Sequence, residues 1–251
     1  DYLSGKEIDK LLYFQSKGHR VISLLAWCEL YLQRLPSDLI TSKELFQGQF
    51  KKTYIPIQLR IKRIADVIIS IVILFITSPL LLLSALIIWL DENGPVFYTQ
   101  TRTGRFGKPI KIIKLRTMDL RSSSLKPSWS KEIDPRVTPI GRLLRKFRID
   151  ELPQLLSVIT GEMSLIGPRP EVPEIEIKLE KEIPHYRLRH LVLPGLSGWA
   201  QVNYPYGASI DDSVNKLSYD LYYLRHFSIF LDFLIFIKTI RIVLDKSIVS
   251  K

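Results

Sequence analysis

The chain has 251 residues, enough for one large domain or two small ones with a buried core, which excludes a miniature protein held together by disulfides or metals. It carries 36 basic and 25 acidic residues, a net charge of +11, so its expected partners are nucleic acid, anionic lipid headgroups or phosphorylated substrates. The single cysteine, Cys28, excludes an intramolecular disulfide, and no secretory signal with a cleavage site is recognisable, which indicates a reducing compartment.

Residues 1–50 show no recognisable chemistry. Helical periodicity over 6–17 and 19–35, followed by turn residues at 36–38, predicts two helices. Because the chain begins at Asp1 instead of a methionine, we expect it to be part of a longer protein. Residues 1–50 are interpreted as a helical N-terminal segment that ends an upstream regulatory domain.

A continuous apolar run occupies residues 64–90. As a straight helix it would be roughly 40 Å long, enough to cross a hydrocarbon core of about 30 Å. Pro79 argues against a simple span because proline removes one helical hydrogen bond and kinks the helix, and Ser78 beside it is placed to bond a freed carbonyl. One interpretation is therefore a spanning anchor, and the one we favour is a re-entrant helix hairpin bent at Ser78 and Pro79.

Basic residues flank both ends of this run, which indicates that both ends are cytoplasmic. The same distribution makes a membrane a better expected partner than nucleic acid. The re-entrant hairpin with its basic flank is assigned to residues 51–93. The flanking residues are Lys51, Lys52, Arg60, Lys62 and Arg63 before the run, and Arg102, Arg105, Lys108, Lys111, Lys114 and Arg116 after it.

Residues 94–251 are expected to form the catalytic domain. Alternating residues predict strands over 96–102 and 110–118, with Gly104 and Gly107 in a hairpin connection. The polar, proline-rich stretch 122–139 predicts a loop, and helical periodicity returns from 140, after 150 and over 172–191. The expected fold class is α/β, mostly helical with a short sheet.

A second apolar stretch covers residues 227–244. At about 100° per residue, Lys238, Arg241 and Asp245 share one sector, while Asp232 points to the opposite, apolar side. This pattern predicts a helix in the membrane interface, and the core helix of a soluble domain is the alternative. In either case Asp232 needs a basic or amide partner.

The adjacent carboxylates Asp150 and Glu151 precede a proline and an apolar helical run. Spacing alone favours a helix cap and a first-turn acid. The functional interpretation is that a helix N-terminus and nearby basic side chains hold a phosphate against an anionic nucleophile. The neighbouring carboxylate would then be available to Mg²⁺. The nearby basic residues are Arg142, Arg145, Lys146 and Arg148.

Ordered motifs beyond residue 61 carry a family resemblance. They are KRIAD (62–66), Ser78-Pro79, GPVFYTQTRTG (94–104), KLRTM (114–118), DPRVTPIGRLLR (134–145), DELPQL (150–155), GEMSLIGPRP (161–170), PGLSGWAQVN (194–203), KLSYDLYYL (216–224) and the LD at 231–232. With these motifs in this order, the chain resembles the monotopic phosphoglycosyl transferases. These polyprenyl-phosphate hexose-1-phosphate transferases initiate bacterial exopolysaccharide and O-antigen assembly at the cytoplasmic face of the inner membrane.

The resemblance implies that Asp150 is the nucleophile and Glu151 its Mg²⁺-associated partner. It also implies a UDP-hexose donor, a covalent aspartyl phosphosugar intermediate, release of UMP, and attack by undecaprenyl phosphate in a second half-reaction. The oligomeric state stays open, with a homodimer as one option. The expected phosphate-binding residues are Lys114, Arg116, Arg145 and Arg169, for each of which a solvated surface charge is the alternative.

Gln201 and Asn203 are expected to hydrogen-bond the sugar or the nucleotide, and the alternative is that they fix a glycine-rich turn. The sequence YPYGAS follows Asn203 where the family frequently has a different continuation, which leaves the hexose undefined. Two rival functions remain open: a conventional glycosyl transferase that releases UDP, and a non-catalytic scaffold on the membrane surface. The four histidines show no spacing of metal ligands.

Overall fold

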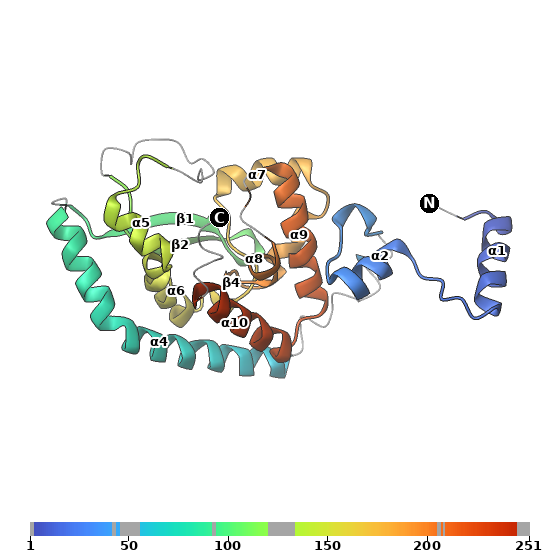
Figure 1. The fold of residues 1–251 in the computed structure, drawn as a ribbon, viewed down its shortest axis with the longest axis horizontal. Helices are drawn as coiled ribbons and strands as arrows, with labels where there is room; N and C mark the ends of the chain where they lie inside the picture. Colours follow the sequence, from blue (N-terminus) through green and yellow to red (C-terminus); the bar gives the residue numbers. More distant parts are fainter. Residues whose placement is uncertain are drawn as a thin grey trace.

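The computed structural model describes residues 3–41, 44–45, 56–91, 94–119, 134–204, 207 and 209–244. Within these residues the protein is mostly helical, with two short pairs of strands (Figure 1). Some of the expectations above lie outside the described residues. They concern Lys51, Lys52, Asp245, residues 122–133 and the segment boundary near residue 50.

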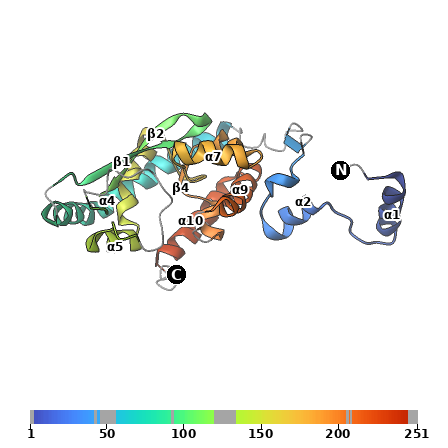
Figure 2. The same ribbon diagram turned by 90° about the horizontal axis from the view of Figure 1, so that it is seen from above.

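The N-terminal region is helical, as predicted, but less regular. Helix α1 (Gly5–Ser16) buries none of its residues, and both ribbon views show it apart from the body of the protein (Figures 1 and 2). In place of one helix over 19–35, α2 (Leu24–Trp27) continues into a π-helical turn, η1 (Cys28–Leu32), and stops where Gln33 adopts a left-handed φ of 52°. The short 3₁₀ helix η2 (Ser37–Leu39) follows at the predicted turn.

Residues beyond α1 pack onto the catalytic part of the chain. Leu25, Leu35 and Ile40 belong to the main hydrophobic core. The backbone N–H of Leu35 donates to the carbonyl of Ser218 over 2.8 Å, and the indole of Trp199 donates to the carbonyl of Gln33 over 2.9 Å. These contacts make residues 25–40 part of the same packed unit as the later helices.

The apolar run forms one continuous helix, α4 (Pro56–Asp91), with Pro79 in its interior. Among the described residues it alone is long and apolar enough to cross a membrane, judged by length and composition. Pro79 has no N–H for the carbonyl of Phe75, and the hydroxyl of Ser78 donates to that carbonyl over 2.8 Å. This confirms the predicted role of Ser78. Figure 1 shows the helix bending along its length, so the element is a single bent helix and not two antiparallel helices.

The predicted hairpin is present. Strands β1 (Phe97–Thr103) and β2 (Pro109–Leu115) pair antiparallel and are joined through the turn η4 (Arg105–Gly107). Gly104 is required at the start of this turn because a Cβ there would lie 2.7 Å from Cγ2 of Ile110. The second strand ends at Leu115 instead of residue 118, and Met118 forms an isolated bridge with Val137.

Helices α5 (Pro139–Lys146), η6 (Ile149–Gln154) and α6 (Leu155–Thr160) follow, and a second sheet closes the core. In that sheet β3 (Ser164–Ile166) pairs parallel with β4 (Gly195–Ser197). The helix predicted over 172–191 is interrupted near Pro184, because proline has no backbone N–H to donate to a helical hydrogen bond. It divides into α7 (Pro173–Glu182) and the 3₁₀ helix η7 (Tyr186–Leu191), and α8 (Trp199–Asn203) and α9 (Ile210–Arg225) complete this part of the fold.

Helix α10 (Ile229–Leu244) has one buried and one exposed apolar side. Leu231 and Ile235 enter the core, whereas Phe230 is 78 % exposed. The predicted partner of Asp232 is Lys62 of α4, whose Nζ lies 2.7 Å from Oδ2. The hydroxyl of Tyr223 donates to Oδ1 of Asp232 over 2.7 Å. The buried charge is thus paired as expected.

The KRIAD motif joins α4 to the rest of the protein. Besides its ion pair, Lys62 donates to the carbonyl of Ile166 over 3.0 Å. Arg63 donates to the last carbonyls of α6, including that of Ile159 over 2.7 Å. Asp66 is buried and accepts the hydroxyl of Ser164 over 2.7 Å. Little more than one turn of α4, from Lys62 to Asp66, is therefore fixed to α6, β3 and α10.

Candidate active site

Asp150 and Glu151 lie in the first turn of η6, which packs against β2, α4, α5 and α6. The preceding residue, Arg148, has a left-handed φ of 53° and turns the chain out of α5 into η6. The next helix, α6, begins at Leu155 with Gln154 as its N-cap. The capping interpretation of Asp150 is therefore wrong, because the residue lies inside a 3₁₀ turn and its side chain caps no helix.

Glu151 is surrounded by cationic side chains. Lys114 Nζ lies 2.8 Å from Oε1 of Glu151, and Arg169 pairs with both carboxylate oxygens, with Nη1 3.4 Å from Oε2. Arg148 Nη1 approaches Oε2 at 3.5 Å. Burial alone would raise the pKa of Glu151, but Arg169 and Lys114 outweigh it and hold the pKa well below its ordinary value. Glu151 is accordingly ionised, and its carboxylate pairs with Lys114, Arg148 and Arg169.

Asp150 is buried, and among the described residues no hydrogen bond or ion pair is made by its carboxylate. Burial raises the pKa of Asp150, as does the neighbouring charge of Glu151, while Lys114, Arg145 and Arg169 act in the opposite direction. Its oxygens are thus close to several positive charges without being engaged by them. This is the arrangement expected of a nucleophile held ready for a phosphorylated substrate.

The surroundings of Glu151 do not fit a magnesium ion bound to this carboxylate. Both oxygens already face Lys114, Arg148 or Arg169. A divalent cation at the same oxygens would lie against these positive charges, which is electrostatically unfavourable in a buried place. The arrangement around Glu151 therefore does not fit the predicted role of this residue as a Mg²⁺ ligand.

Two of the other predicted phosphate-binding residues take different places. Nε of Arg145 donates to Oγ1 of Thr117 over 2.9 Å. The guanidinium also lies close enough to Asp150 to act against the rise in the pKa of that carboxyl. Arg116 is buried and donates to the carbonyl of Ile88 over 3.2 Å, in the last turn of α4, where helix carbonyls lack partners. Arg145 thus lies near Asp150, and the hydrogen bond of Arg116 secures the end of α4.

Gln201 and Asn203 form no hydrogen bond with Glu151 among the described residues. Both lie on α8, which packs against α9 and α10. The amide of Gln201 donates to the carbonyl of Leu196 over 2.9 Å, and that of Asn203 donates to the carbonyl of Trp199 over 2.8 Å. Lys238 in turn donates to Oδ1 of Asn203 over 2.9 Å. These contacts fit the alternative interpretation, in which the two amides fix a turn.

Comparison with known proteins settles the family. The sequence model described as bacterial sugar transferase matches residues 57–246, which include every residue of the carboxylate and cation cluster. The chain belongs to the bacterial sugar transferase family.

Named relatives of this sugar transferase act on undecaprenyl phosphate. The chain is 44 % identical over 189 residues to an Aeromonas hydrophila UDP-N-acetylgalactosamine-undecaprenyl-phosphate N-acetylgalactosaminephosphotransferase, covering 75 % of this chain and 45 % of the relative. It is 38 % identical over 193 residues to the Escherichia coli UDP-glucose:undecaprenyl-phosphate glucose-1-phosphate transferase, covering 76 % and 41 %. A Caulobacter vibrioides enzyme of the same name is 39 % identical over 181 residues, covering 71 % and 68 %. The chain thus spans less than half the length of the first two.

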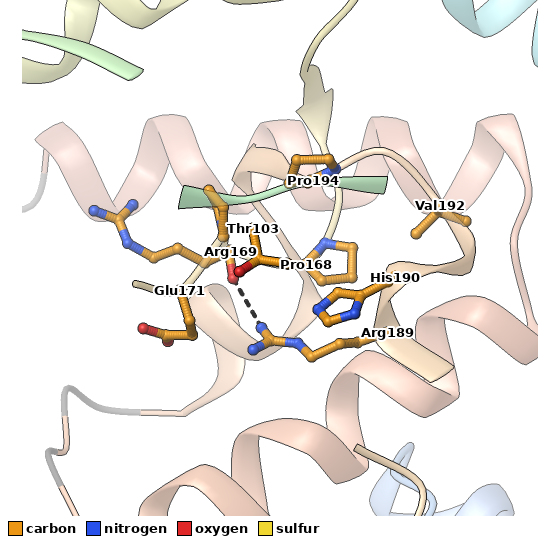
Figure 3. Close-up of a pocket in the computed structure, with 10 residues that line it drawn as sticks. Thr103, Pro168, Arg169, Glu171, Arg189, His190, Val192 and Pro194 are labelled. Atoms are coloured by element: carbon orange, nitrogen blue, oxygen red, sulfur yellow. Dashed lines mark hydrogen bonds between the residues drawn. The ribbon is translucent and has the colours of Figure 1, made fainter. Parts of the chain in front are cut away.

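The sequence patterns missed the residues that hold Arg169 of this sugar transferase in place. Nη2 of Arg189 donates to the backbone carbonyl of Arg169 over 2.8 Å, drawn as the dashed line in Figure 3. Arg189 is buried and pairs with Asp220 at 2.9 Å, and its Nη1 donates to the hydroxyl of Tyr186 over 2.6 Å. Burial raises the pKa of Asp220 to about 6, although Arg189 opposes the shift. These partners are far apart in the sequence, so no local pattern signals them.

A second group of acidic and histidine side chains occurs outside the Asp150 region. Ligand atoms of Glu176, Glu180 and His190 lie within 4.8 Å of one another. Glu176 is buried against His190, and Glu180 pairs with Arg187 at 3.2 Å. These contacts join α7 to η7 and give the group a structural role.

Proposed function

We propose that this sugar transferase moves a hexose 1-phosphate from a UDP-sugar to polyprenyl phosphate through a covalent aspartyl phosphosugar. The observation that carries the proposal is the pair of adjacent carboxylates with opposite surroundings. Glu151 is held by Lys114 and Arg169, whereas Asp150 has no partner among the described residues and lies within their influence. The printed names of the relatives describe reactions of this class.

In the first half-reaction, a carboxylate oxygen of Asp150 attacks the phosphorus that bears the sugar. The bond between that phosphorus and the bridging oxygen breaks, and the bridging oxygen leaves with UMP. Lys114, Arg145 and Arg169 offset the negative charge of the diphosphate as it approaches the carboxylate. Glu151 keeps the cations oriented and does not itself react.

In the second half-reaction, an oxygen of polyprenyl phosphate attacks the same phosphorus. The acyl phosphate bond to Asp150 breaks, which restores the carboxylate and yields polyprenyl diphosphate sugar. One set of cations serves both steps because donor and acceptor present a phosphate to the same place. The rival glycosyl transferase would instead break the bond from the sugar to phosphate and release UDP.

The nucleotide product tests this proposal. Purified protein incubated with a panel of UDP-sugars and undecaprenyl phosphate is expected to yield UMP and a polyprenyl diphosphate sugar. Release of UDP would replace the proposal by glycosyl transfer, and release of neither nucleotide would support the scaffold. We further propose a requirement for Mg²⁺, bound by the diphosphate and not by Glu151. The same assay with EDTA should then lose UMP release, and Mg²⁺ should restore it.

We propose that α4 is re-entrant and places the site at the cytoplasmic face of the bacterial inner membrane. The bend, the Ser78 hydrogen bond and the basic residues beyond both ends of the helix support this topology. Cysteines placed at the exposed Arg60, near Lys62, and at Arg105, in protein with Cys28→Ser, should both resist labelling from outside intact cells. Pro79→Leu removes the helix breaker and should increase external labelling at Arg105. External labelling at either position before that change would mean that the helix spans the membrane.

A further inference from the structure

The loop that carries Arg169 is fixed along its length. Residues 168–171 lie between β3 and α7, and each of their four backbone carbonyls accepts a hydrogen bond from another segment. The two outer carbonyls accept from the backbone N–H groups of Gly195 and Thr103, each over 2.9 Å. The two inner carbonyls accept from arginine side chains. The backbone around Arg169 is therefore held by contacts from four different positions.

Proline on both sides of Arg169 narrows its conformation further. Proline has a fixed φ, and a residue that precedes a proline, as Arg169 precedes Pro170, is restricted to extended conformations. Figure 3 shows the side chain of Arg169 leaving the loop on the side away from Arg189. On that side its guanidinium pairs with Glu151, the neighbour of Asp150. The direction of this side chain is thus set by the backbone of the loop.

One of the two arginines that hold the loop, Arg102 of β1, has no role in the two half-reactions. Its Nη1 donates to the carbonyl of Pro170 over 3.3 Å and lies 3.8 Å from Oε2 of Glu171. Its Nε and Nη2 both donate to Oε1 of Gln100, over 3.1 and 2.7 Å, and these two bonds fix the plane of the guanidinium. Arg102 therefore ties the loop to the strand on which it lies.

The place of Arg102 is electrostatically costly. Its side chain is only 19 % exposed. Burial lowers the pKa of Arg102, the charge of Glu171 opposes this shift, and the positive charge of Arg169 adds to it. An apolar side chain in the same place would avoid both the desolvation and the repulsion between two arginines. Stability alone therefore does not explain an arginine here, whereas a need to fix the loop does.

Resting on the proposed function, we infer that Arg102 is a positioning residue for transfer of the sugar phosphate. It holds residues 168–171 so that the guanidinium of Arg169 is aligned on the phosphate in both half-reactions, and it touches neither donor nor acceptor itself. A cation that is aligned before the substrate arrives needs no reorganisation during the reaction. Displacement of such a group by about 1 Å lowers a rate by about a hundredfold.

A double-mutant cycle on the first half-reaction tests this inference. The rate constant of the UMP burst, from UDP-sugar without acceptor, is measured in the wild type, Arg102→Gln, Arg169→Ala and the double variant. Because Arg102 acts through Arg169, we expect Arg102→Gln to lower this rate constant about tenfold to a hundredfold in the wild type. In Arg169→Ala the same change should lower it by less than about twofold. Equal reductions in the two backgrounds, or an unchanged rate in Arg102→Gln, would overturn the inference.

Arg105→Gln is the matched control in the same hairpin. Nε of Arg105 also donates to a backbone carbonyl, that of Leu191, over 3.2 Å, but this carbonyl does not belong to residues 168–171. The control should keep the wild-type burst rate. A rate as low as that of Arg102→Gln would overturn the inference, because loss of any arginine of the hairpin would then be sufficient.

Arg102→Lys covers failure of Arg102→Gln to fold. Lysine keeps the positive charge but lacks the planar fork that holds Gln100 and Pro170 together. Its burst rate should therefore also fall, and only when Arg169 is present. A wild-type rate in Arg102→Lys would overturn the inference. A wild type without any UMP burst would instead overturn the proposed function, so the two failures are distinguishable.

Discussion

Asp150→Asn should reduce turnover by several orders of magnitude, because an amide lacks the anionic oxygen that attacks phosphorus. The fold should tolerate the change. The carboxylate of Asp150 makes no hydrogen bond among the described residues and caps no helix, so the free energy of unfolding should stay within about 1 kcal/mol of the wild type. Steady-state UMP release and thermal unfolding in detergent measure the two quantities separately.

Mass spectrometry identifies the reacting residue directly. Wild-type protein quenched after mixing with UDP-sugar, without acceptor, should carry a sugar phosphate on the peptide that contains Asp150, and Asp150→Asn should not. Asp211→Asn is a matched control, since Asp211 is exposed in the first turn of α9. Near-normal turnover of Asp150→Asn would rule out this carboxylate as the nucleophile.

Lys62→Met should destabilise the protein by about 3–5 kcal/mol, because it leaves Asp232 buried without its cation. Both side chains of this ion pair are only 12 % exposed, and their Nζ to Oδ2 distance is 2.7 Å. Lys62 also bonds the carbonyl of Ile166, so the substitution releases α4 from β3 as well as from α10. The midpoint of thermal unfolding in detergent should fall accordingly.

The double variant Lys62→Met with Asp232→Asn separates the buried charge from lost packing. Asparagine keeps an acceptor for the hydroxyl of Tyr223 but carries no charge. Most of the lost stability should therefore return in the double variant. Lys178→Met, at an exposed position of α7, is the control for removing a lysine and should change stability by less than about 0.5 kcal/mol. If Lys62→Met is as stable as this control, the ion pair does not hold α4 in place.

Local chemistry in the sequence determined several elements by itself. Period-two alternation and the glycines at 104 and 107 predicted the β1 and β2 hairpin, because alternation and turn residues act over a few neighbouring positions. Pro79 and Ser78 predicted an interrupted helical hydrogen bond and its replacement, which depend on residues within one turn. An aspartate on an apolar helix face required a partner, and Asp232 has one.

Tertiary structure alone decided the identities of the partners. The parallel pairing of β3 with β4 joins residues 31 positions apart, such as Ser164 with Gly195. Glu151 meets Lys114 from β2 and Arg169 from the loop after β3, and only their meeting distinguishes Glu151 from Asp150. Arg116 donates to the carbonyl of Ile88 in the last turn of α4, a contact that the sequence pattern did not indicate. A sequence pattern indicates which side chains share a face of a helix or strand. The pKa of a charged side chain, however, depends on the groups that pack against that face, and these come from distant segments of the chain.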